Sequence, residues 1–208
     1  MAQRVRDGTS RILNSQACNQ ATEDRGVRII SGGASAVTES GGEGARWQHH
    51  PASVLIVGPG FQATGFLAPM RITGRAGRDL NDAWRNGAEA YLGISVRGFP
   101  NLFMLYGPNT NLGHNSIVYM LESQIAYVIS ALDTLERHGQ RSLEVRERVQ
   151  SDFNQRLQRR MRATVWDSGC HSWYKTENGL NTNNWPGFTF TYRRLTRRLE
   201  PADYEMSP

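Results

Sequence analysis

The stretch Phe99–Ser116, which reads FPNLFMLYGPNTNLGHNS, decides the fold that this sequence predicts. Its apolar part, Leu102–Tyr106, is typical of a buried strand, and a turn of Gly, Pro and Asn then leads into a long amphipathic helix. Backbone N–H groups at such a corner point toward whatever lies above the sheet edge. The corner therefore suits a phosphate, a carboxylate or the electron-rich edge of a cofactor ring.

Two helices are predicted beyond this corner. The first carries an apolar stripe at intervals of three and four: Ile117, Leu121, Ile125, Val128, Leu132 and Leu135. Asn115 or Ser116 is placed to cap its start, and Gly139 to end it. The second is expected from about Ser142, with Val145, Val149, Phe153 and Leu157 on one face. Arginines near its end complement the helix dipole.

Short strands are predicted on either side of these helices. Val27–Ile30 and Ser35–Glu39 each have the composition of a strand, and the glycine-rich Ser40–Gly44 indicates a turn. Ser53–Gly58 is a continuous apolar run that ends in glycine, which is how a fully buried parallel strand reads. Near the C-terminus, Phe188–Phe190 indicates one more short strand within irregular loops.

Composition narrows the classes of protein that this chain can be. Its 208 residues are 38% hydrophobic and 21% charged, with a net charge of +5, and no apolar run is long enough to span a membrane. The two cysteines, Cys18 and Cys170, provide neither a disulfide framework nor metal-ligand spacing, which favours a reducing, cytoplasmic setting. Nearly all the positive charge is arginine spread along the chain, a distribution typical of a solvated surface.

Three blocks of the sequence resemble Baeyer–Villiger-type flavin monooxygenases. The first is Val54–Thr64, which is similar to the motif where those enzymes return from the nicotinamide-binding domain to the flavin domain. The second is Gly98–Ser116, preceded by Ala90–Ile94. The third is the aromatic Trp166–Tyr174 together with Trp185–Gly187. The three blocks follow the family's order and spacing, so the resemblance covers most of the chain.

The resemblance implies a flavin site at the corner formed by the turn after Tyr106 and the helix that follows it. In the family, this turn and the helix behind it face the pyrimidine end of the flavin, where N–H groups and the helix N-terminus stabilise negative charge. Carried over position by position, the cofactor-binding residues are Gly60, Phe61, Gly107, Pro108, Asn109, Leu112, Gly113, His114, Asn115 and Ser116. The implied cofactors are FAD and NADPH, and the implied reaction is oxygenation of a ketone or a soft heteroatom by O2.

Two departures from the family change what the resemblance implies. Pro59 stands where the family has threonine, which removes a hydroxyl and an N–H. More importantly, the chain has neither of the G-x-G-x-x-G fingerprints that hold the pyrophosphates of FAD and NADPH. The expected fold class is therefore α/β: the C-terminal half of a flavoprotein with two Rossmann-like dinucleotide-binding domains, incomplete, with long helices and an aromatic, loop-rich tail.

The same resemblance divides the chain into four parts. We expect a disordered or non-native leader in 1–24, the last strands of the nicotinamide-binding domain in 25–64, and the return into the FAD-binding domain in 65–165. The aromatic tail occupies 166–208. Alone, such a fragment is expected to be inactive; the alternative is a non-catalytic remnant, or a partner subunit that completes a flavin site on another chain. Unpaired strand edges also favour association into an oligomer.

Other residues suggest chemical roles, but the sequence does not favour these roles over structural ones. His114 can act as an acid or base, but a histidine near a helix start is more often a hydrogen-bonded turn residue. Cys170 and His171 are adjacent, and adjacent residues rarely reach the geometry of a nucleophile and its base. A basic nucleic-acid surface over Arg146–Arg162 predicts salt-sensitive binding, yet no nucleic-acid motif accompanies it. No catalytic residue and no metal site are therefore assigned.

Overall fold

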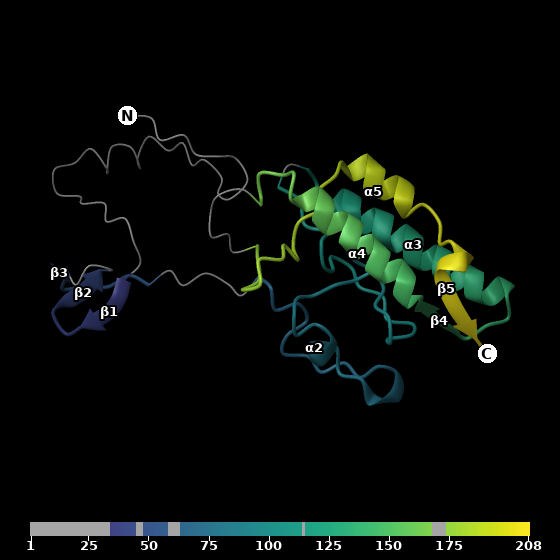
Figure 1. Ribbon diagram of the computed structural model, residues 1–208, viewed down its shortest axis with the longest axis horizontal. Coiled ribbons are helices and arrows are strands. Elements are labelled where there is room, and N and C mark those ends of the chain that lie inside the picture. Colours follow the sequence, from purple (N-terminus) through teal and green to yellow (C-terminus); the bar gives the residue numbers. More distant parts are fainter. Residues whose placement is uncertain (1–33, 45–47, 58–62, 114, 168–173) are drawn as a thin grey trace. The chain divides into compact units, whose positions relative to one another are not determined.

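The computed structural model describes residues 34–44, 48–57, 63–113, 115–167 and 174–208 (Figure 1). The chain divides into two compact units, one within 11–61 and the other containing 62–208. The predicted leader in 1–24 and the predicted strand Val27–Ile30 lie outside the described residues.

The first unit holds a small antiparallel sheet. Its strands are β1 (Ala34–Thr38), β2 (Gly41–Gly44) and β3 (His49–Pro51), in the order β1-β2-β3. The strand predicted near Ser35–Glu39 is confirmed as β1. The turn predicted over Ser40–Gly44 is shorter than expected, because Gly41–Gly44 pairs with both neighbouring strands.

The buried parallel strand predicted at Ser53–Gly58 is wrong for the part that the structure describes. Val54, Leu55, Ile56 and Val57 form no strand, and their side chains are between 56% and 92% exposed. A strand is buried on both faces only when neighbouring strands and covering helices surround it. Among the described residues, nothing pairs with this segment, so its apolar side chains stay uncovered.

The second unit contains the helices and a two-stranded sheet (Figure 1). The long helices are α3 (Ile117–Arg137) and α4 (Glu147–Met161). Shorter ones are η1 (Arg75–Gly77), α2 (Leu80–Ala83), α5 (Thr189–Leu195) and η2 (Pro201–Asp203). Strands β4 (Ser142–Val145) and β5 (Tyr204–Ser207) pair antiparallel, with Val145 opposite Tyr204.

Two predicted elements differ in type from those in the structure. The segment from Ser142 is not the start of a helix but strand β4, because β5 supplies a partner from far along the chain; the second helix begins at Glu147. Phe188–Phe190 is not a strand but leads into α5. There Thr189, Tyr192 and Thr196 are buried at spacings of three and four, while Phe188 and Phe190 are exposed.

The opening segment Leu102–Tyr106 is also less regular than predicted. Only Phe103 makes a strand-like bridge, to Ser95, and only Met104 is buried. Leu105 and Tyr106 are 50% and 44% exposed. The segment lacks a second neighbouring strand among the described residues, which explains why its alternating apolar side chains do not complete a buried strand.

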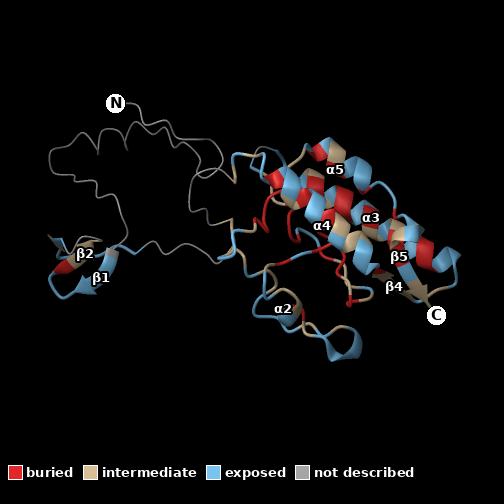
Figure 2. Cartoon of the chain, viewed as in Figure 1, coloured by how far each residue is buried: buried red, intermediate tan, exposed pale blue. Residues whose placement is uncertain are grey.

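The first long helix is confirmed, but the face that it buries is not the predicted stripe. Its buried residues are Met120, Ser123, Gln124, Tyr127, Ala131, Thr134 and Leu135. Ile125 and Leu132, which belong to the predicted stripe, are 45% and 54% exposed. Figure 2 shows the exposed and buried positions alternating along α3. The inner face thus combines apolar residues with the polar Ser123, Gln124 and Thr134, while several large apolar residues point outward.

One hydrophobic core joins α3, α4, α5 and the β4–β5 sheet. At its centre, Ile94, Met120 and Ala131 are 0% exposed, and Leu157 is 3% exposed. A smaller cluster around Leu80, Val96 and Phe99 lies under the loops. These helices and strands pack against the irregular segment that contains the turn after Tyr106.

Buried tyrosine hydroxyls tie the irregular segment to the C-terminal elements. The hydroxyl of Tyr204 lies 3.0 Å from that of Tyr127 and 3.1 Å from the Ser95 hydroxyl. Tyr91 donates to Asp203 at 2.6 Å. Tyr192 donates at 2.6 Å to the Leu92 carbonyl, so segment 91–95 is fastened to both α5 and β5.

The tyrosine network predicts a loss of stability in alkali. Burial raises the pKa of Tyr127 far above its ordinary value, and that of Tyr204 to about 12. In the unfolded chain a tyrosine ionises near pH 10. The stability from these groups is therefore complete below about pH 10 and is lost as the pH rises through their folded-state pKa values. We expect the melting temperature, measured by circular dichroism, to fall steeply above about pH 10.

Phenylalanine variants separate this effect from general alkaline damage. Tyr127→Phe should cost about 1 kcal/mol at neutral pH, for the lost hydrogen bond, and should flatten the alkaline slope. Tyr119→Phe removes a hydroxyl outside the network and should leave the slope unchanged. An equal slope for wild type and Tyr127→Phe would contradict the role given to the network.

Candidate functional site

The turn that follows Leu102–Tyr106 is fastened to a segment more than seventy residues later in the chain. Asn109 N–H donates to the Thr182 carbonyl at 2.8 Å, and Asn111 N–H donates to the Asn183 carbonyl at 2.9 Å. Trp185 N–H returns a bond to the Asn111 carbonyl at 2.9 Å. The two segments thus form a short parallel pairing, which we call the corner clamp: residues 107–112 with 181–185.

The buried side chain of Asn109 joins the two segments of the corner clamp. It is 3% exposed, and its amide nitrogen donates to the carbonyls of Asn181 at 2.7 Å and Asn184 at 3.2 Å. Its backbone φ of 58° is a left-handed conformation that asparagine tolerates better than most residues. Asn109 is one of the predicted cofactor-binding residues, and its side chain satisfies the backbone of the partner segment.

Glycine is required where the corner packs against the segment before it. A Cβ on Gly107 would lie 2.3 Å from the Gly93 carbonyl oxygen, and a Cβ on Gly93 would lie 2.2 Å from Thr110 Cγ2. Gly93 also has a φ of 69°. Pro108 is buried in the same contact. Gly107 and Pro108, both predicted cofactor residues, therefore form the packed back of the corner.

The exposed front of the corner is the start of α3. Gly113, Asn115 and Ser116 are exposed, whereas Leu112 packs partly against the core. Ser116 occupies the N-cap position but makes no side-chain cap hydrogen bond. The first N–H groups of α3, at the positive end of the helix dipole, therefore receive no hydrogen bond from the N-cap side chain. Asn115 is held by a bond from its amide nitrogen to the Thr189 hydroxyl at 3.0 Å.

Three predicted cofactor residues lie outside the described residues. They are Gly60, Phe61 and His114. The same holds for Cys170 and His171. The predicted residues that the structure brings together are therefore Gly107–Asn109 at the back of the corner and Leu112–Gly113 with Asn115–Ser116 toward its front.

Tyr106 lies directly before the corner and is not among the residues that the sequence predicts for the site. Its N–H donates to Gln124 on α3 at 2.8 Å, and its hydroxyl donates to Asn111 Oδ1 at 2.8 Å. Its φ of 61° is unusual for an aromatic residue, and such strain is concentrated at functional sites. Burial, followed by the charge of Tyr174, raises the pKa of its hydroxyl. The sequence signal that could have identified Tyr106 is its position: a residue that favours strands stands directly before the turn residues Gly107 and Pro108.

Several buried polar atoms of the clamp have no hydrogen-bond partner among the described residues. They are both amide atoms of Asn184, the amide nitrogen of Asn181 and the hydroxyl of Thr182. Buried groups of this kind are normally satisfied by an ordered water, an ion or a ligand. The corner therefore has unused donors and acceptors beneath its surface, which fits a polar group bound in front of it.

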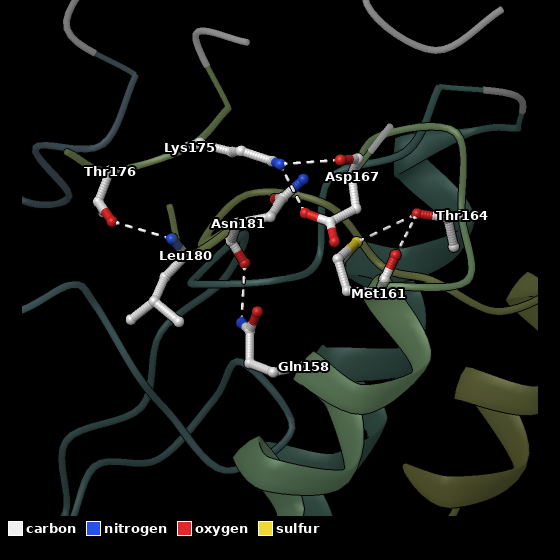
Figure 3. Close-up of polar contacts among 8 residues, drawn as sticks. All are labelled: Gln158, Met161, Thr164, Asp167, Lys175, Thr176, Leu180 and Asn181. Atoms are coloured by element: carbon white, nitrogen blue, oxygen red, sulfur yellow. Dashed lines mark hydrogen bonds and ion pairs between the residues drawn. The ribbon is translucent and has the colours of Figure 1, made fainter. Parts of the chain in front are cut away.

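An ion pair supports the far side of the clamp (Figure 3). Lys175, the only lysine in the chain, contacts Asp167 Oδ1 at 2.5 Å, and its side chain is 19% exposed. On the neighbouring loop, Gln158 of α4 donates to the Asn181 carbonyl at 3.0 Å. The ion pair joins the ends of segment 167–175, and the bond from α4 anchors the loop that supplies the clamp.

The described residues show neither a metal centre nor a membrane span. No group of three or more His, Cys, Asp or Glu side chains in the described ranges is placed to hold a metal ion. None of the helices in those ranges is both long and apolar enough to cross a bilayer.

Comparison with known proteins identifies relatives over nearly the whole chain. No protein-family model matches. A Baeyer–Villiger monooxygenase from Pseudomonas aeruginosa is 44% identical over 202 residues, which are 96% of this chain and 38% of that protein. One from Streptomyces coelicolor is 38% identical over 203 residues, 97% of this chain and 39% of that protein. This chain is a relative of Baeyer–Villiger monooxygenases.

Solved structures agree with this assignment at the level of the fold. The crystal structure of an OTEMO complex with FAD and NADP has a TM-score of 0.71 and 24% identity, over 87% of this chain and 34% of that one. A cyclohexanone monooxygenase mutant from Rhodococcus sp. Phi1, bound to NADP+, has a TM-score of 0.64 and 25% identity over 83% of this chain and 33% of that one. The resemblance to Baeyer–Villiger enzymes is confirmed, as are FAD and NADPH as cofactors of the intact family.

The extent of the match matters as much as its strength. The chain spans about two-fifths of the length of the Baeyer–Villiger relatives that it matches. This extent fits the expected C-terminal portion of such an enzyme.

Variants of Asn109 test whether the corner clamp holds the site together. Asn109→Ala removes two donors from buried carbonyls and places alanine at a positive φ, so we expect it to lower the free energy of unfolding by about 2–4 kcal/mol. Asn109→Gly keeps the backbone conformation but not the donors, and should cost less. Chemical denaturation measures both. A loss below about 0.5 kcal/mol for Asn109→Ala would contradict the clamp.

Proposed function

We propose that this chain supplies one wall of the flavin site of an FAD- and NADPH-dependent monooxygenase. The observation that carries the proposal is the 44% identity to a Baeyer–Villiger monooxygenase over 96% of the chain. The substrate class that we infer is a ketone or a soft heteroatom compound, with O2 as the second substrate. The cytoplasm is the proposed setting, since the two cysteines form no disulfide framework.

The exposed front of the corner is where the flavin ring would be held. Gly113 offers a backbone without a side chain, and Asn115 and Ser116 precede helix α3, whose first N–H groups receive no hydrogen bond from the N-cap side chain. These groups would bind the electron-rich edge of the ring and stabilise negative charge there. When bound, FAD reduced by NADPH supplies the chemistry that activates O2. The clamp behind the front keeps the N–H groups in place.

We propose that the chain is inactive alone. Binding of a dinucleotide depends on a glycine-rich turn that places the pyrophosphate on a helix N-terminus, and this sequence contains no G-x-G-x-x-G. The front of the corner contacts only one edge of a ring, which gives little affinity for the whole cofactor. The chain would therefore hold neither FAD nor NADPH long enough to turn over.

A second candidate function is that of a partner subunit that completes a flavin site on another chain. Four large apolar side chains exposed on α3 favour it, because an uncovered apolar helix face usually marks a contact with another protein surface. A non-catalytic remnant would share the fold and lack such a partner.

Spectra and kinetics of the purified chain test the proposed inactivity. We expect no visible flavin absorbance after purification, and NADPH consumption in the presence of added FAD and a cyclic ketone no faster than without the protein. The P. aeruginosa relative, assayed in parallel, serves as the positive control. A flavin band that co-purifies with the isolated chain, together with ketone-dependent NADPH consumption, would overturn the proposal.

A further inference from the structure

A hollow of about 450 Å³ lies between the second half of α3 and the turn that joins α5 to η2. On the α3 side its lining follows one face of the helix, at spacings of three and four, and includes Ile129, Ser130, Asp133, Thr134 and Arg137. On the other side it is lined by part of 197–201. Helix α5 packs against α3, which brings that turn beside the helix (Figure 1). The volume is in the range of sites that hold a small organic molecule.

Three guanidinium groups meet in this hollow. Arg197 and Arg198 are exposed, and neither side chain makes an ion pair or a hydrogen bond with any described residue. Arg137 donates from Nε to the Asp133 carbonyl and from Nη2 to the Thr134 hydroxyl, both at 3.1 Å. These bonds hold its guanidinium in place and leave Nη1 without a partner in the described ranges. A guanidinium fork matches the oxygens of a phosphate group better than any other side chain does.

The turn that carries Arg197 and Arg198 is fixed on both sides. After them, the Leu199 N–H donates to the Ser130 hydroxyl of α3 at 3.1 Å, and the Leu199 side chain is buried in the core. Before them, the buried Thr196 hydroxyl donates to the Tyr192 carbonyl at 2.9 Å. The backbone of both arginines is therefore in place without a ligand, which lowers the cost of ordering a binding site there.

The negative charges around the hollow limit the kind of anion that fits it. Among the described residues of its lining, Asp133 is the acidic one, and its carboxylate forms no ion pair with the three arginines. Glu136 and Glu200 are exposed beside the lining in the sequence. An extended polyanion would meet all three carboxylates and be repelled, whereas a compact ligand can direct a single phosphate to the arginines.

The rest of the lining suits the non-phosphate part of such a ligand. A carboxylate accepts hydrogen bonds from sugar hydroxyls, and it has this role toward ribose in dinucleotide sites, so Asp133 provides a sugar contact. Ile129 is 53% exposed in the hollow, and Pro201 of the opposite wall is half-buried. These two side chains provide an apolar surface that a flat heterocyclic base would cover.

We propose that the hollow binds a nucleoside phosphate. The phosphate is bound by Arg197, Arg198 and Nη1 of Arg137. The sugar hydroxyls donate to Asp133, and the base packs against Ile129. Shape and charge together thus select a small ligand that is anionic at one end, polar in the middle and apolar at the other end.

This site is separate from the proposed flavin wall. From Ile117 to Asp133 the distance is about 24 Å along the axis of α3, at about 1.5 Å per residue. The hollow therefore lies well away from the exposed front of the corner. The inference goes beyond the proposed function, and its test needs neither flavin nor monooxygenase activity.

Isothermal titration calorimetry of the full chain with AMP tests the proposal. We expect saturable binding with a Kd below about 1 mM at low ionic strength. Adenosine and inorganic phosphate, titrated separately, should each bind at least about tenfold more weakly, because each lacks part of the contacts. A flat titration with AMP would overturn the proposal. Adenosine or inorganic phosphate binding as tightly as AMP would overturn it too, since the phosphate or the nucleoside would then contribute nothing.

Substitutions at exposed positions locate the bound AMP. Arg197→Gln/Arg198→Gln should weaken AMP binding at least about tenfold. The control Arg159→Gln/Arg194→Gln removes the same charge from exposed residues outside the hollow, and should change the Kd less than about twofold. An unchanged Kd in the first variant would place AMP elsewhere, and an equal loss in both would reduce the binding to general attraction. Either result overturns the proposal.

Asp133→Asn tests the sugar contact. The substitution removes the acceptor for the ribose hydroxyls and also the charge that repels a bare phosphate. We therefore expect the preference for AMP over inorganic phosphate to narrow at least about threefold, with circular dichroism showing an unchanged fold. An unchanged preference would contradict the role given to Asp133 and, with it, the assignment of a nucleoside phosphate.

Discussion

The pairing between residues 107–112 and 181–185 is the interaction on which the rest of the site depends. Backbone bonds from Asn109, Asn111 and Trp185 hold two loops that have no regular sheet to support them. The buried amide of Asn109 then satisfies carbonyls of the partner loop. Together with the bond from Asn115 to Thr189, these bonds fix the turn before α3 to the C-terminal segment. The front of the corner is consequently a product of long-range contacts, and not of the turn alone.

The helices and the small sheet stabilise that pairing from behind. Gln158 of α4 holds the Asn181 carbonyl, Tyr192 of α5 holds Leu92, and Gln124 of α3 holds Tyr106. Each bond joins an irregular loop to an element of the core. Loops can carry function only when a rigid scaffold positions them, and here the scaffold reaches the loops through buried polar side chains. This explains why the inner face of α3 contains Ser123, Gln124 and Thr134 beside its apolar residues.

The sequence predicts correctly the elements that local residue patterns determine. It does not predict the elements that depend on pairing with distant parts of the chain. The helix after Ser116 and the end near Gly139 follow from spacing and capping, and both are present. Strand β4 exists because β5 pairs with it from sixty residues away, so its helix-like apolar spacing misled the prediction. The exposed Val54–Val57 has the opposite cause, since its pattern predicts neighbours that the described residues do not contain. Asn109 lies in the corner, but the resemblance could not reveal that its side chain is buried against the carbonyls of Asn181 and Asn184.

The corner is formed before any cofactor binds, because protein groups alone hold it. Amide hydrogen exchange of the isolated, cofactor-free chain measures this directly at single residues. A preformed corner predicts that the N–H groups of Asn109, Asn111 and Trp185 exchange as slowly as those in the middle of α3, while the N–H groups of Ile117 and Val118 at its uncapped start exchange rapidly. Rapid exchange at Asn109, Asn111 and Trp185, with protection only in α3 and α4, would show that the corner is not preformed.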